Sequence, residues 1–574
     1  MTNNSLTHIK QATLIVMCIM NLVYMHYTII TTNSPEYPLD GTSSIDNITG
    51  IFIDIFIVFF ITSLLTLGKF KPTIATTFIV TYLWSFCNIL YSRFFNSYLT
   101  ISAIGQGTSL FDPLVFNAVV CGFKWQDLFF IIELIFFILI YKKTKTAGTY
   151  RTIITLCLSA LLLILFDMTA HFIYCYSIPE CRYYSYYKKR IISRHFDEHG
   201  RLCEPIITTF HRSSLRTLYY DIVEDFNGKK ELSGSQKASI AEAVKESSKS
   251  MIPFSDSVNY NKNIIFIIVE SYMSFSSDMK VKGKEITPFL NSLRHDSSTY
   301  YNGHMAPNIT LGESSDGQYI YMTGLLPLKS AITVSKAKNK VLPGMPKLLE
   351  KLGFKSRMII PTQPSLWNQS IMCQQYGFHQ LFSAKDYGDK TQQELNDHEV
   401  FELASKIDNQ NKCKKTFSVI LTVSMHYPYT EPIDKSFKLE DSNLSTELKN
   451  YLIACHYTDK CIHDYINHLK TSGLYDKSLI IITADHHVHS TDFGSGISNE
   501  LPLYIINSGI DNQKSWHGPC NQIDVYTTLM NILNIETEWC GLGHSLLSPN
   551  YQSSLNDSKW DISEWVLRNN YFNK

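Results

Sequence analysis

The sequence predicts an α-helical transmembrane domain followed by an α/β domain with a mainly parallel sheet. Long apolar runs fill the first part of the chain, and short apolar runs alternate with amphipathic stretches after Asn263. A chain of 574 residues is too long for one hydrophobic core, which also favours several domains. Lys plus Arg and Asp plus Glu each number 51, so the net charge gives no indication of nucleic acid, and we expect no such partner.

Five apolar runs in the first 175 residues approach the length that crosses a bilayer, about 20 residues. They are residues 12–30, 48–67, 74–91, 126–141 and 152–173. Lys69 and Lys71 lie between the second and third runs, and Lys142 and Lys143 lie between the fourth and fifth. Basic residues mark cytoplasmic loops. We therefore expect a multi-pass protein of the cytoplasmic (inner) membrane, with everything after the fifth run on the exported, periplasmic or extracellular, side.

Three acidic residues, Asp54, Glu133 and Asp167, lie within these apolar runs. Acids inside a membrane are costly and usually face a bundle interior or an aqueous cavity, which makes them candidates for function. The alternative is that each lies near an interface or pairs with a neighbouring helix.

The domain boundaries follow from these changes in composition. Residues 1–175 are expected to form the transmembrane domain, and residues 176–258 an interfacial and linker segment. Within that segment, residues 181–196 mix Tyr with Arg and Lys, which suits the headgroup layer of a membrane. Residues 259–574 are expected to form the exported catalytic domain.

Buried strands and helices alternate in the exported part. The predicted strands are 263–271, 355–362, 416–428, 478–487 and 501–509, and the clearest predicted helices are 343–352 and 448–471. The strand segments are short and almost wholly apolar, as in a sheet covered on both faces.

Polar side chains stand at the ends of three predicted strands. Glu270 ends the first, His426 follows the third, and Asp485 and His486 end the fourth. Ligands gather at the carboxyl ends of parallel strands, and carboxylates with imidazoles bind divalent metals. Taken alone, Asp485-His486 is also compatible with a hydrogen-bonded turn, but the convergence at one edge favours a metal site.

The segment 312–316 reads Gly-Glu-Ser-Ser-Asp and precedes a predicted helix. A Ser at a helix start near the sheet edge can serve as a nucleophile, which makes Ser314 the candidate. The common alternative for such a Ser is a helix N-cap.

The exported part resembles the lipoteichoic-acid-synthase type of phosphoglycerol transferase, within the alkaline phosphatase/sulfatase superfamily. The resemblance rests on motifs that occur in family order over about residues 260–550. They are VES, GESSDGQYIYMTGLLP, LWNQ, SMHYPY, TADHH, LPLYI and NQIDVYTTLMNIL. Five amino-terminal spans before an exported domain also match this family.

The resemblance implies roles for individual residues. Glu270, Ser314, Asp485 and His486 match the metal ligands, with Ser314 in place of the usual Thr nucleophile, and His426 matches the active-site histidine. Trp367 matches an aromatic residue near the lipid headgroup, and we expect Asn368 and His487 to join it in binding substrate. His304, His489 and His517 are further candidates for the pocket. The expected cofactor is a divalent metal, Mn²⁺ first, with Zn²⁺ or Mg²⁺ as alternatives.

Three departures from the family pattern concern the substrate. Gln369 stands where the family has an Arg that would bind phosphate through two hydrogen bonds. A histidine usual a few residues earlier is absent, and His487 replaces a Gly. These changes leave the identity of the transferred headgroup open, although the expected reaction type is unchanged.

The function expected from this set is a membrane-bound transferase. It moves a phosphoglycerol-type or phosphoethanolamine-type headgroup from a phospholipid donor to an envelope glycan or lipid acceptor, through a covalent phosphoserine. The alternatives are a metal-dependent phosphodiesterase or sulfatase-like hydrolase with the same residues, and a catalytically inactive sensor on the same fold.

Overall fold

A computed structural model divides the chain into two compact units, Met1–Ile104 with Val119–Gly228 and Gly105–Ala118 with Lys229–Lys574. The residues that the structure describes are 3–33, 43–95, 98–105, 116, 119–144, 214–215, 218, 231–252, 261–329, 331–388, 394–410, 415–440, 443–488, 493, 497–535, 537–553 and 555–573. The predicted domain boundaries, after residues 175 and 258, lie outside these ranges and stay predictions.

The first unit is built from helices. They are α1 (Asn3–Asn33), α2 (Ser43–Leu65), α3 (Phe70–Phe95), α4 (Ile101–Ile104), the 3₁₀ turn η2 (Trp125–Asp127) and α6 (Leu128–Lys143). Four predicted apolar runs fall on α1, α2, α3 and α6, and the fifth lies outside the described residues. Leu6–Ile29 and Phe70–Arg93 are long and apolar enough to cross a membrane, whereas the apolar part of α2 is shorter, Ile51–Leu65. Two helices thus have the length and composition of membrane spans, and the described residues do not show five.

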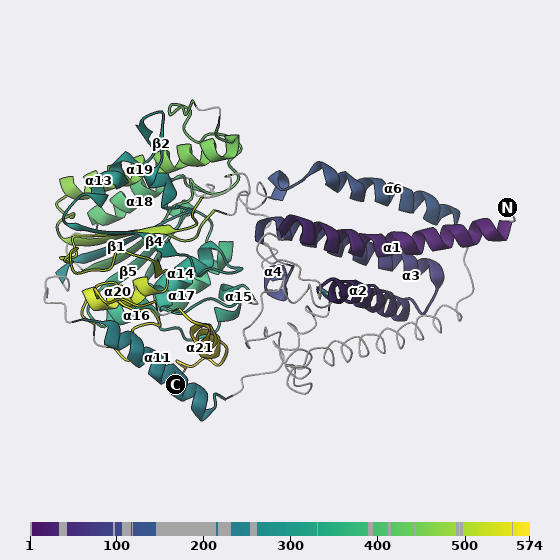
Figure 1. Cartoon of the computed structure of the whole chain (residues 1–574), viewed down its shortest axis with the longest axis horizontal. Helices are drawn as coiled ribbons and strands as arrows, with labels where there is room; N and C mark the ends of the chain where they lie inside the picture. The colour runs from purple at the N-terminus through teal and green to yellow at the C-terminus, as the bar shows by residue number, and fades with distance from the viewer. Residues whose placement is uncertain are drawn as a thin grey trace. The chain divides into compact units, whose positions relative to one another are not determined.

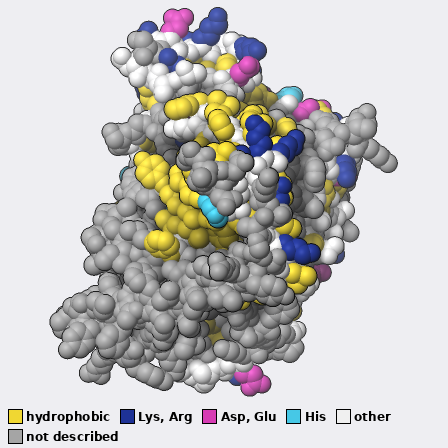
Figure 2. All heavy atoms as spheres, turned by 90° about the vertical axis from the view of Figure 1, so that its right-hand side faces the viewer, with side chains coloured by type: hydrophobic (Ala, Val, Ile, Leu, Met, Phe, Trp, Pro, Cys, Tyr) yellow, Lys and Arg dark blue, Asp and Glu magenta, His cyan; other side chains and the backbone are white. Residues whose placement is uncertain are grey.

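Apolar side chains also cover the outside of these helices. Along α6 the exposed side chains include Ile131, Ile135 and Phe136, while Phe130 and Phe137 face inward and are buried. Figure 2 shows hydrophobic side chains gathered on the face that it draws. A helix that is apolar on its inner and outer sides is typical of a lipid environment.

The second unit contains an eight-stranded sheet in the order β10-β4-β9-β8-β1-β7-β5-β6. The strands are β1 (Asn263–Val269), β4 (Thr299–Ala306), β5 (Lys355–Ile359), β6 (Gln380–Phe382), β7 (Thr416–Leu421), β8 (Ser478–Ala484), β9 (Leu501–Ile506) and β10 (Cys520–Asn521). Strand β9 runs antiparallel to both its neighbours, and every other pair in the sheet is parallel. The small hairpin β2 (Lys280–Val281) and β3 (Lys284–Glu285) stands apart.

Helices cover both faces of the sheet (Figure 1). One face carries α13 (Pro288–Arg294), α18 (Asp397–Gln410) and α19 (Thr446–Thr471); the other carries α14 (Ser314–Thr323), α16 (Met345–Glu350), α17 (Gln369–Tyr376) and α20 (Asp524–Ile532). The shorter elements are α12 (Phe275–Asp278), α15 (Thr333–Ala337), η5 (Leu366–Asn368) and η6 (Ala384–Asp386). This double cover explains why every residue of β7, β8 and β9 is buried and why these strands are mostly apolar in sequence.

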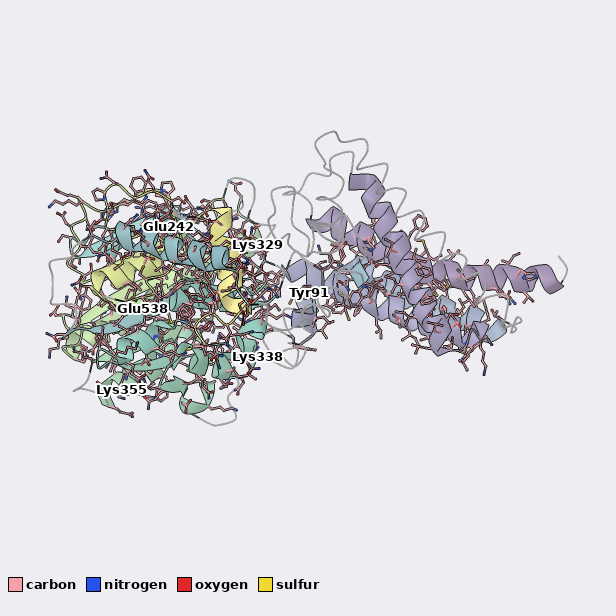
Figure 3. The ribbon with its side chains drawn as sticks, turned by 90° about the horizontal axis from the view of Figure 1, so that it is seen from below. Tyr91, Glu242, Lys329, Lys338, Lys355 and Glu538 are labelled. Atoms are coloured by element: carbon pink, nitrogen blue, oxygen red, sulfur yellow. The ribbon has the colours of Figure 1, made fainter. Side chains whose placement is uncertain are left out.

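One part of the predicted linker belongs to the second unit. Helix α11 (Gly234–Ser250) packs against α21 (Asp557–Arg568), and Lys559 Nζ lies 3.4 Å from a carboxylate oxygen of Glu246. The Ser545 backbone N–H also donates to Ser250 Oγ at 2.9 Å. Glu242, labelled in Figure 3, lies on this helix. Ile240 and Ala243 give α11 a buried face.

The predicted fold class, an α-helical membrane part followed by a mainly parallel α/β domain, is confirmed. All five predicted strands form, each beginning at its predicted first residue, and the helices predicted at 343–352 and 448–471 appear as α16 and α19. Strands β4, β6 and β10 were not predicted. They are short or carry polar residues at buried positions, such as Asn302 in β4, so their pattern is not that of a buried strand.

Candidate active site

Strands β1 and β8 bring two acids together. They are parallel neighbours with Val269 opposite Ala484, so the next residues, Glu270 and Asp485, leave the sheet side by side. Both side chains and that of His486 are buried. One ligand atom from each of Glu270, Asp485 and His486 lies within 4.8 Å of the others. The carboxyl edge of the sheet thus presents two carboxylates and an imidazole toward one point.

Ser314, the first residue of α14, completes the cluster. Its hydroxyl lies 3.3 Å from Glu270 Oε2 and 3.1 Å from His486 Nε2. The preceding Glu313 has φ 46° and ψ −121°, a strained backbone conformation of the kind that clusters at functional sites. Ser314 is not the N-cap of α14, since Glu313 holds that place. The geometry therefore favours Ser314 as a nucleophile over Ser314 as a helix N-cap.

Gly317 explains how α14 comes so close to the strand end. A Cβ on Gly317 would lie 2.4 Å from the backbone oxygen of Asp485, a distance that no side chain tolerates. Glycine therefore allows the helix backbone to pack directly on β8. Residues three apart share a helix face, so this contact also places Ser314 over the cluster.

Asp316 fixes the loop that leads into Ser314. Its Oδ2 accepts hydrogen bonds from the Thr310 N–H at 3.0 Å, the Thr310 hydroxyl at 2.8 Å and the Gly312 N–H at 2.9 Å. Burial raises the pKa of Asp316 to about 6 even though these hydrogen bonds lower it. The carboxylate thus holds residues 310–312 around the start of α14.

The two carboxylate oxygens of Asp485 have different partners, the backbone for one and His486 for the other. Oδ1 accepts from the backbone N–H of Ser271 at 2.9 Å and of His486 at 2.8 Å, and Oδ2 lies 3.7 Å from His486 Nε2. The Asp485 backbone oxygen accepts from Gln522 Nε2 at 2.7 Å. Backbone donors therefore orient this side chain whether or not a cation is bound.

The tautomer of His486 follows from its second contact. Its Nδ1 lies 2.7 Å from the backbone oxygen of His487, which can only accept, so Nδ1 carries a proton. In the neutral ring this leaves the lone pair on Nε2, the nitrogen that faces Ser314 and Glu270. A backbone partner on the far nitrogen is the usual support of a metal-binding histidine.

Charge coupling in the cluster is strong. Burial and the neighbouring Glu270 carboxylate raise the pKa of Asp485 to about 7. Burial opposes ionisation of Glu270 as well, but the charges of His486 and His426 and hydrogen bonds to His486 and Ser271 lower its pKa to about 2. The carboxylates of Asp485 and Glu270 raise the pKa of His486 although burial lowers it. Two acids this close favour a cation, and a donor set of carboxylate, imidazole and hydroxyl fits a divalent metal.

The other predicted residues are placed as follows. His426 lies just beyond β7 and is close enough to Glu270 to affect its charge, and its Nδ1 contacts the Tyr427 backbone oxygen. Trp367 and Asn368 form the turn into α17, both with positive φ, 49° and 55°. Substrate binding by Trp367, Asn368 and His487 stays a prediction.

Three further histidines had been expected near the pocket. The ring nitrogens of His517 lie 2.7 Å from the Tyr301 backbone oxygen and 2.8 Å from that of Asn512, and its place in the pocket stays a prediction. His304 is exposed and lies 3.3 Å from Glu500. His489 lies outside the described residues.

Sequence reasoning missed Asp316, Gly317 and Gln522 as parts of the site. Asp316 and Gly317 belong to the motif GESSDGQYIYMTGLLP. A Gly one turn after the nucleophile could have indicated close packing of the helix. Gln522 carried no signal, because it reaches Asp485 from a distant part of the chain.

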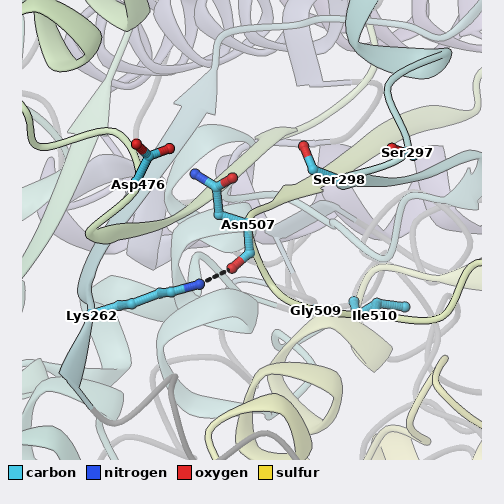
Figure 4. A pocket seen from close by; sticks show the side chains of 7 residues that line it. All are labelled: Lys262, Ser297, Ser298, Asp476, Asn507, Gly509 and Ile510. Carbon is cyan, nitrogen blue, oxygen red and sulfur yellow. Dashed lines mark hydrogen bonds between the residues drawn. The ribbon is translucent and has the colours of Figure 1, made fainter.

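A second polar hollow lies at the opposite, amino edge of the sheet (Figure 4). Its volume is about 210 Å³, and its lining includes Lys262, Ser298, Asp476 and Asn507. Lys262 Nζ donates to the Asn507 backbone oxygen at 2.5 Å, and Ser298 Oγ donates to Asp296 at 2.8 Å.

Comparisons with known proteins agree with this geometry. The family model described as sulfatase matches residues 262–535. The chain is 26% identical to lipoteichoic acid synthase 2 of Bacillus subtilis over 520 residues, 84% of this chain and 76% of that protein. It is 25% identical to lipoteichoic acid synthase of Staphylococcus aureus over 499 residues, 80% of this chain and 72% of that protein.

A solved membrane protein has a similar fold over most of the chain. The lipooligosaccharide phosphoethanolamine transferase A of Neisseria meningitidis is 12% identical, with a TM-score of 0.53 over 91% of this chain and 95% of that one. At this identity the likeness concerns the fold alone. The predicted resemblance, a sulfatase-family domain of the lipoteichoic-acid-synthase type behind amino-terminal membrane helices, is confirmed.

Proposed function

We propose that this protein is a phosphotransferase of the membrane. It moves a phosphoglycerol-type or phosphoethanolamine-type headgroup from a phospholipid to an envelope glycan or lipid. The observation that carries the proposal is the Ser314 hydroxyl, which lies within 3.3 Å of Glu270 and 3.1 Å of His486 at the edge of the sheet. The relatives support the class of reaction, because those named above are lipoteichoic acid synthases and a phosphoethanolamine transferase.

Glu270, Asp485, His486 and Ser314 would hold a divalent cation, with Mn²⁺ preferred and Zn²⁺ or Mg²⁺ as alternatives. Such a cation lowers the pKa of a bound hydroxyl and offsets the charge of a phosphate. Two carboxylates leave the site short of positive charge, which an added cation supplies.

The first half of the reaction belongs to Ser314 and His426. Ser314 Oγ, having lost its proton to water, forms a bond to phosphorus as the bond from phosphorus to the diacylglycerol oxygen breaks. His426 gives a proton to that departing oxygen. The headgroup phosphate is then esterified to Ser314.

The second half reverses these roles. An acceptor hydroxyl gives its proton to His426 and attacks phosphorus. The bond from phosphorus to Ser314 Oγ breaks, and Ser314 Oγ takes back a proton from water. The headgroup now belongs to the acceptor, and Ser314 and His426 are restored. We expect Trp367, Asn368 and His487 to contact the donor headgroup, with Gln369 in place of a phosphate-binding guanidinium.

The protein as a whole is proposed to lie in the inner membrane with its sulfatase-family domain exported. The support is the position of Lys69, Lys71, Lys142 and Lys143 in loops assigned to the cytoplasm. Reporter fusions after Lys71 and after Pro253 are expected to report opposite compartments. The same compartment for both contradicts this orientation.

The test of the reaction uses the full chain in detergent with Mn²⁺ and vesicles of phosphatidylglycerol or phosphatidylethanolamine. Mass spectrometry is expected to find a headgroup-phosphate adduct on the peptide that contains Ser314. Ser314→Ala is expected to abolish the adduct and to lower the transfer rate by several orders of magnitude. Ser314→Thr is expected to retain adduct and transfer because it keeps the hydroxyl. Ser298→Ala, at the amino edge, is the matched control and behaves as wild type.

The rival functions give different results. Headgroup release to water that persists in Ser314→Ala indicates a hydrolase that uses a bound water. Absence of metal binding and of both activities indicates an inactive sensor. An adduct on Ser315 in place of Ser314 contradicts the assigned nucleophile.

A further inference from the structure

Glu133 lies on the inward face of α6, in the first unit. On one side of it Phe130 packs on Tyr82 of α3, with ring centroids 5.3 Å apart, and on the other Phe137 stacks on Phe78 at 3.7 Å. Glu133 lies between these two contacts on the same helix face. Its exposed fraction is 6%, so the carboxyl group is enclosed by the helix bundle.

Neither carboxylate oxygen of Glu133 has a hydrogen-bond partner among the described residues. Two other buried acids of the first unit have partners. Asp54 lies 3.1 Å from His26 Nε2 and accepts from the N–H and hydroxyl of Ser214, and Asp127 lies 2.7 Å from Arg93. Burying an ionised carboxylate without partners costs several kcal/mol. Glu133 therefore differs from an acid that serves as a structural pair.

Asn21 of α1 is a second buried polar residue of this bundle. It follows Cys18 by one turn and donates through Nδ2 to Thr81 Oγ1 at 3.4 Å. Cys18 and Tyr82, the neighbour of Thr81, are both within electrostatic range of Glu133. Among the described residues Asn21 Oδ1 also lacks a partner.

The missing partners of the Glu133 carboxyl group and of Asn21 Oδ1 are both accounted for if Glu133 carries a proton. An ionised carboxylate offers only acceptors, as does the amide oxygen of Asn21, so the two would repel. A carboxylic acid has one O–H to donate. We propose that Glu133 is a proton-binding site within the membrane unit, held as the neutral acid with Asn21 Oδ1 as the acceptor of its O–H.

The surroundings contain no competing charge among the described residues. The titratable groups that face Glu133 are the thiol of Cys18 on α1 and the phenol of Tyr82 on α3, both neutral acids. The buried acids Asp54 of α2 and Asp127, just before α6, are already paired, with His26 and Arg93 respectively. The hydroxyl pair Thr62–Thr77, at 2.6 Å, joins α2 and α3 and is satisfied, as polar contacts between membrane helices usually are. Packing alone thus accounts for the threonines but not for Glu133.

The experiment uses the full chain in lipid vesicles and dicyclohexylcarbodiimide, an apolar reagent that adds to protonated carboxyl groups. We expect an adduct on the peptide that contains Glu133, with a yield that falls severalfold as the pH is raised from 6 to 9. Glu133→Gln loses this adduct, and Glu242→Gln, an exposed acid of α11 (Figure 3), retains it.

Asn21→Leu tests the acceptor. Removal of the amide oxygen makes the neutral acid less favourable. The pH at which the labelling yield falls to half is therefore expected to be lower than in wild type. Infrared spectroscopy adds a second readout: at pH 7 the carbonyl band of buried carboxylic acids is expected to contain a component that Glu133→Gln lacks, beside that of the buried Asp485. Failure to label Glu133 in folded protein at pH 6, a yield independent of pH, or absence of that component overturns the proposal.

Discussion

At the carboxyl edge of the sheet Glu270, Asp485 and His486 are buried and point at one another, whereas at the amino edge Lys262 and Asp476 line an open hollow. Both edges carry acidic, basic and hydroxyl side chains, so composition does not distinguish them. The difference lies in burial and convergence. At the carboxyl edge the pKa of Asp485 rises to about 7 because burial and Glu270 oppose its charge. Perturbed groups in a buried cluster indicate a functional site, and groups satisfied near water do not.

The largest expected effect comes from Asp485→Asn. Asn keeps an oxygen for the backbone N–H groups of Ser271 and His486 but places a neutral amide toward the cation. Isothermal titration is expected to show Mn²⁺ affinity lowered by more than about 100-fold, beyond the loss from outer-shell changes at metal sites. Asp476→Asn, at the amino edge, is the control and leaves the affinity unchanged. Equal affinity in the two variants would falsify the assigned cluster.

Asp316→Ala tests the loop before Ser314. Three donors, two from Thr310 and one from Gly312, lose their acceptor, and each buried donor left unpaired costs about 1–3 kcal/mol. We expect kcat to fall by about 10- to 100-fold, as for misplaced reacting groups, with Mn²⁺ affinity near that of wild type. Asp316→Asn, which retains an acceptor, recovers part of kcat. If Mn²⁺ affinity and kcat fall together, Asp316 acts on the whole site and not on the loop.

Acid is expected to weaken metal binding. The pKa values of Asp485 and His486 are raised in the cluster, so both hold protons below neutral pH, and a cation must displace them. Mn²⁺ affinity therefore rises with pH between 6 and 8, by up to about tenfold per pH unit for each proton displaced. Titration calorimetry in buffers of different ionisation enthalpy counts the released protons. A count of zero at pH 6 contradicts the charge coupling described above.

The smallest effect is expected from Lys262→Ala at the amino edge. Its hydrogen bond to the Asn507 backbone oxygen lies beside an open hollow, so its loss changes the free energy of unfolding by less than about 1 kcal/mol. Transfer activity is expected to stay as in wild type. An activity loss with unchanged thermal stability would show that this edge also takes part in the reaction.

The sequence predicted the parts of the fold that have strong periodicity. Strands β1 and β8 are mostly apolar runs. The polar residues at their ends, Glu270 and Asp485, were expected to meet and do lie together, because parallel strands end at one edge. Strand β9 was predicted as a strand, but its antiparallel direction depends on its partners β4 and β8, and no local pattern encodes that. The role of Gln522 was hidden for the same reason, since its contact with Asp485 exists only in the folded chain.

In the membrane unit the sequence marked Asp54 and Glu133 equally, as acids in apolar helices. Their environments differ because Asp54 meets Ser214 and Leu215, from 160 and 161 residues further along the chain. Partners at that separation cannot be read from a helix pattern. For Asp54 the expectation of pairing with a neighbouring helix is correct, through His26 of α1, while Asp167 lies outside the described residues.

Because backbone N–H groups hold Asp485 Oδ1 and the His487 carbonyl holds His486 Nδ1, two of the proposed ligands are oriented without a cation. Binding of the cation then costs little side-chain entropy, because these side chains are already ordered. A freely rotating side chain would lose more entropy. Chelation is accordingly expected to yield a folded apoprotein that regains activity when Mn²⁺ is restored. The strand ends therefore form a binding site that exists without the metal. Occupancy of this site depends on the metal concentration outside the cell membrane and not on folding.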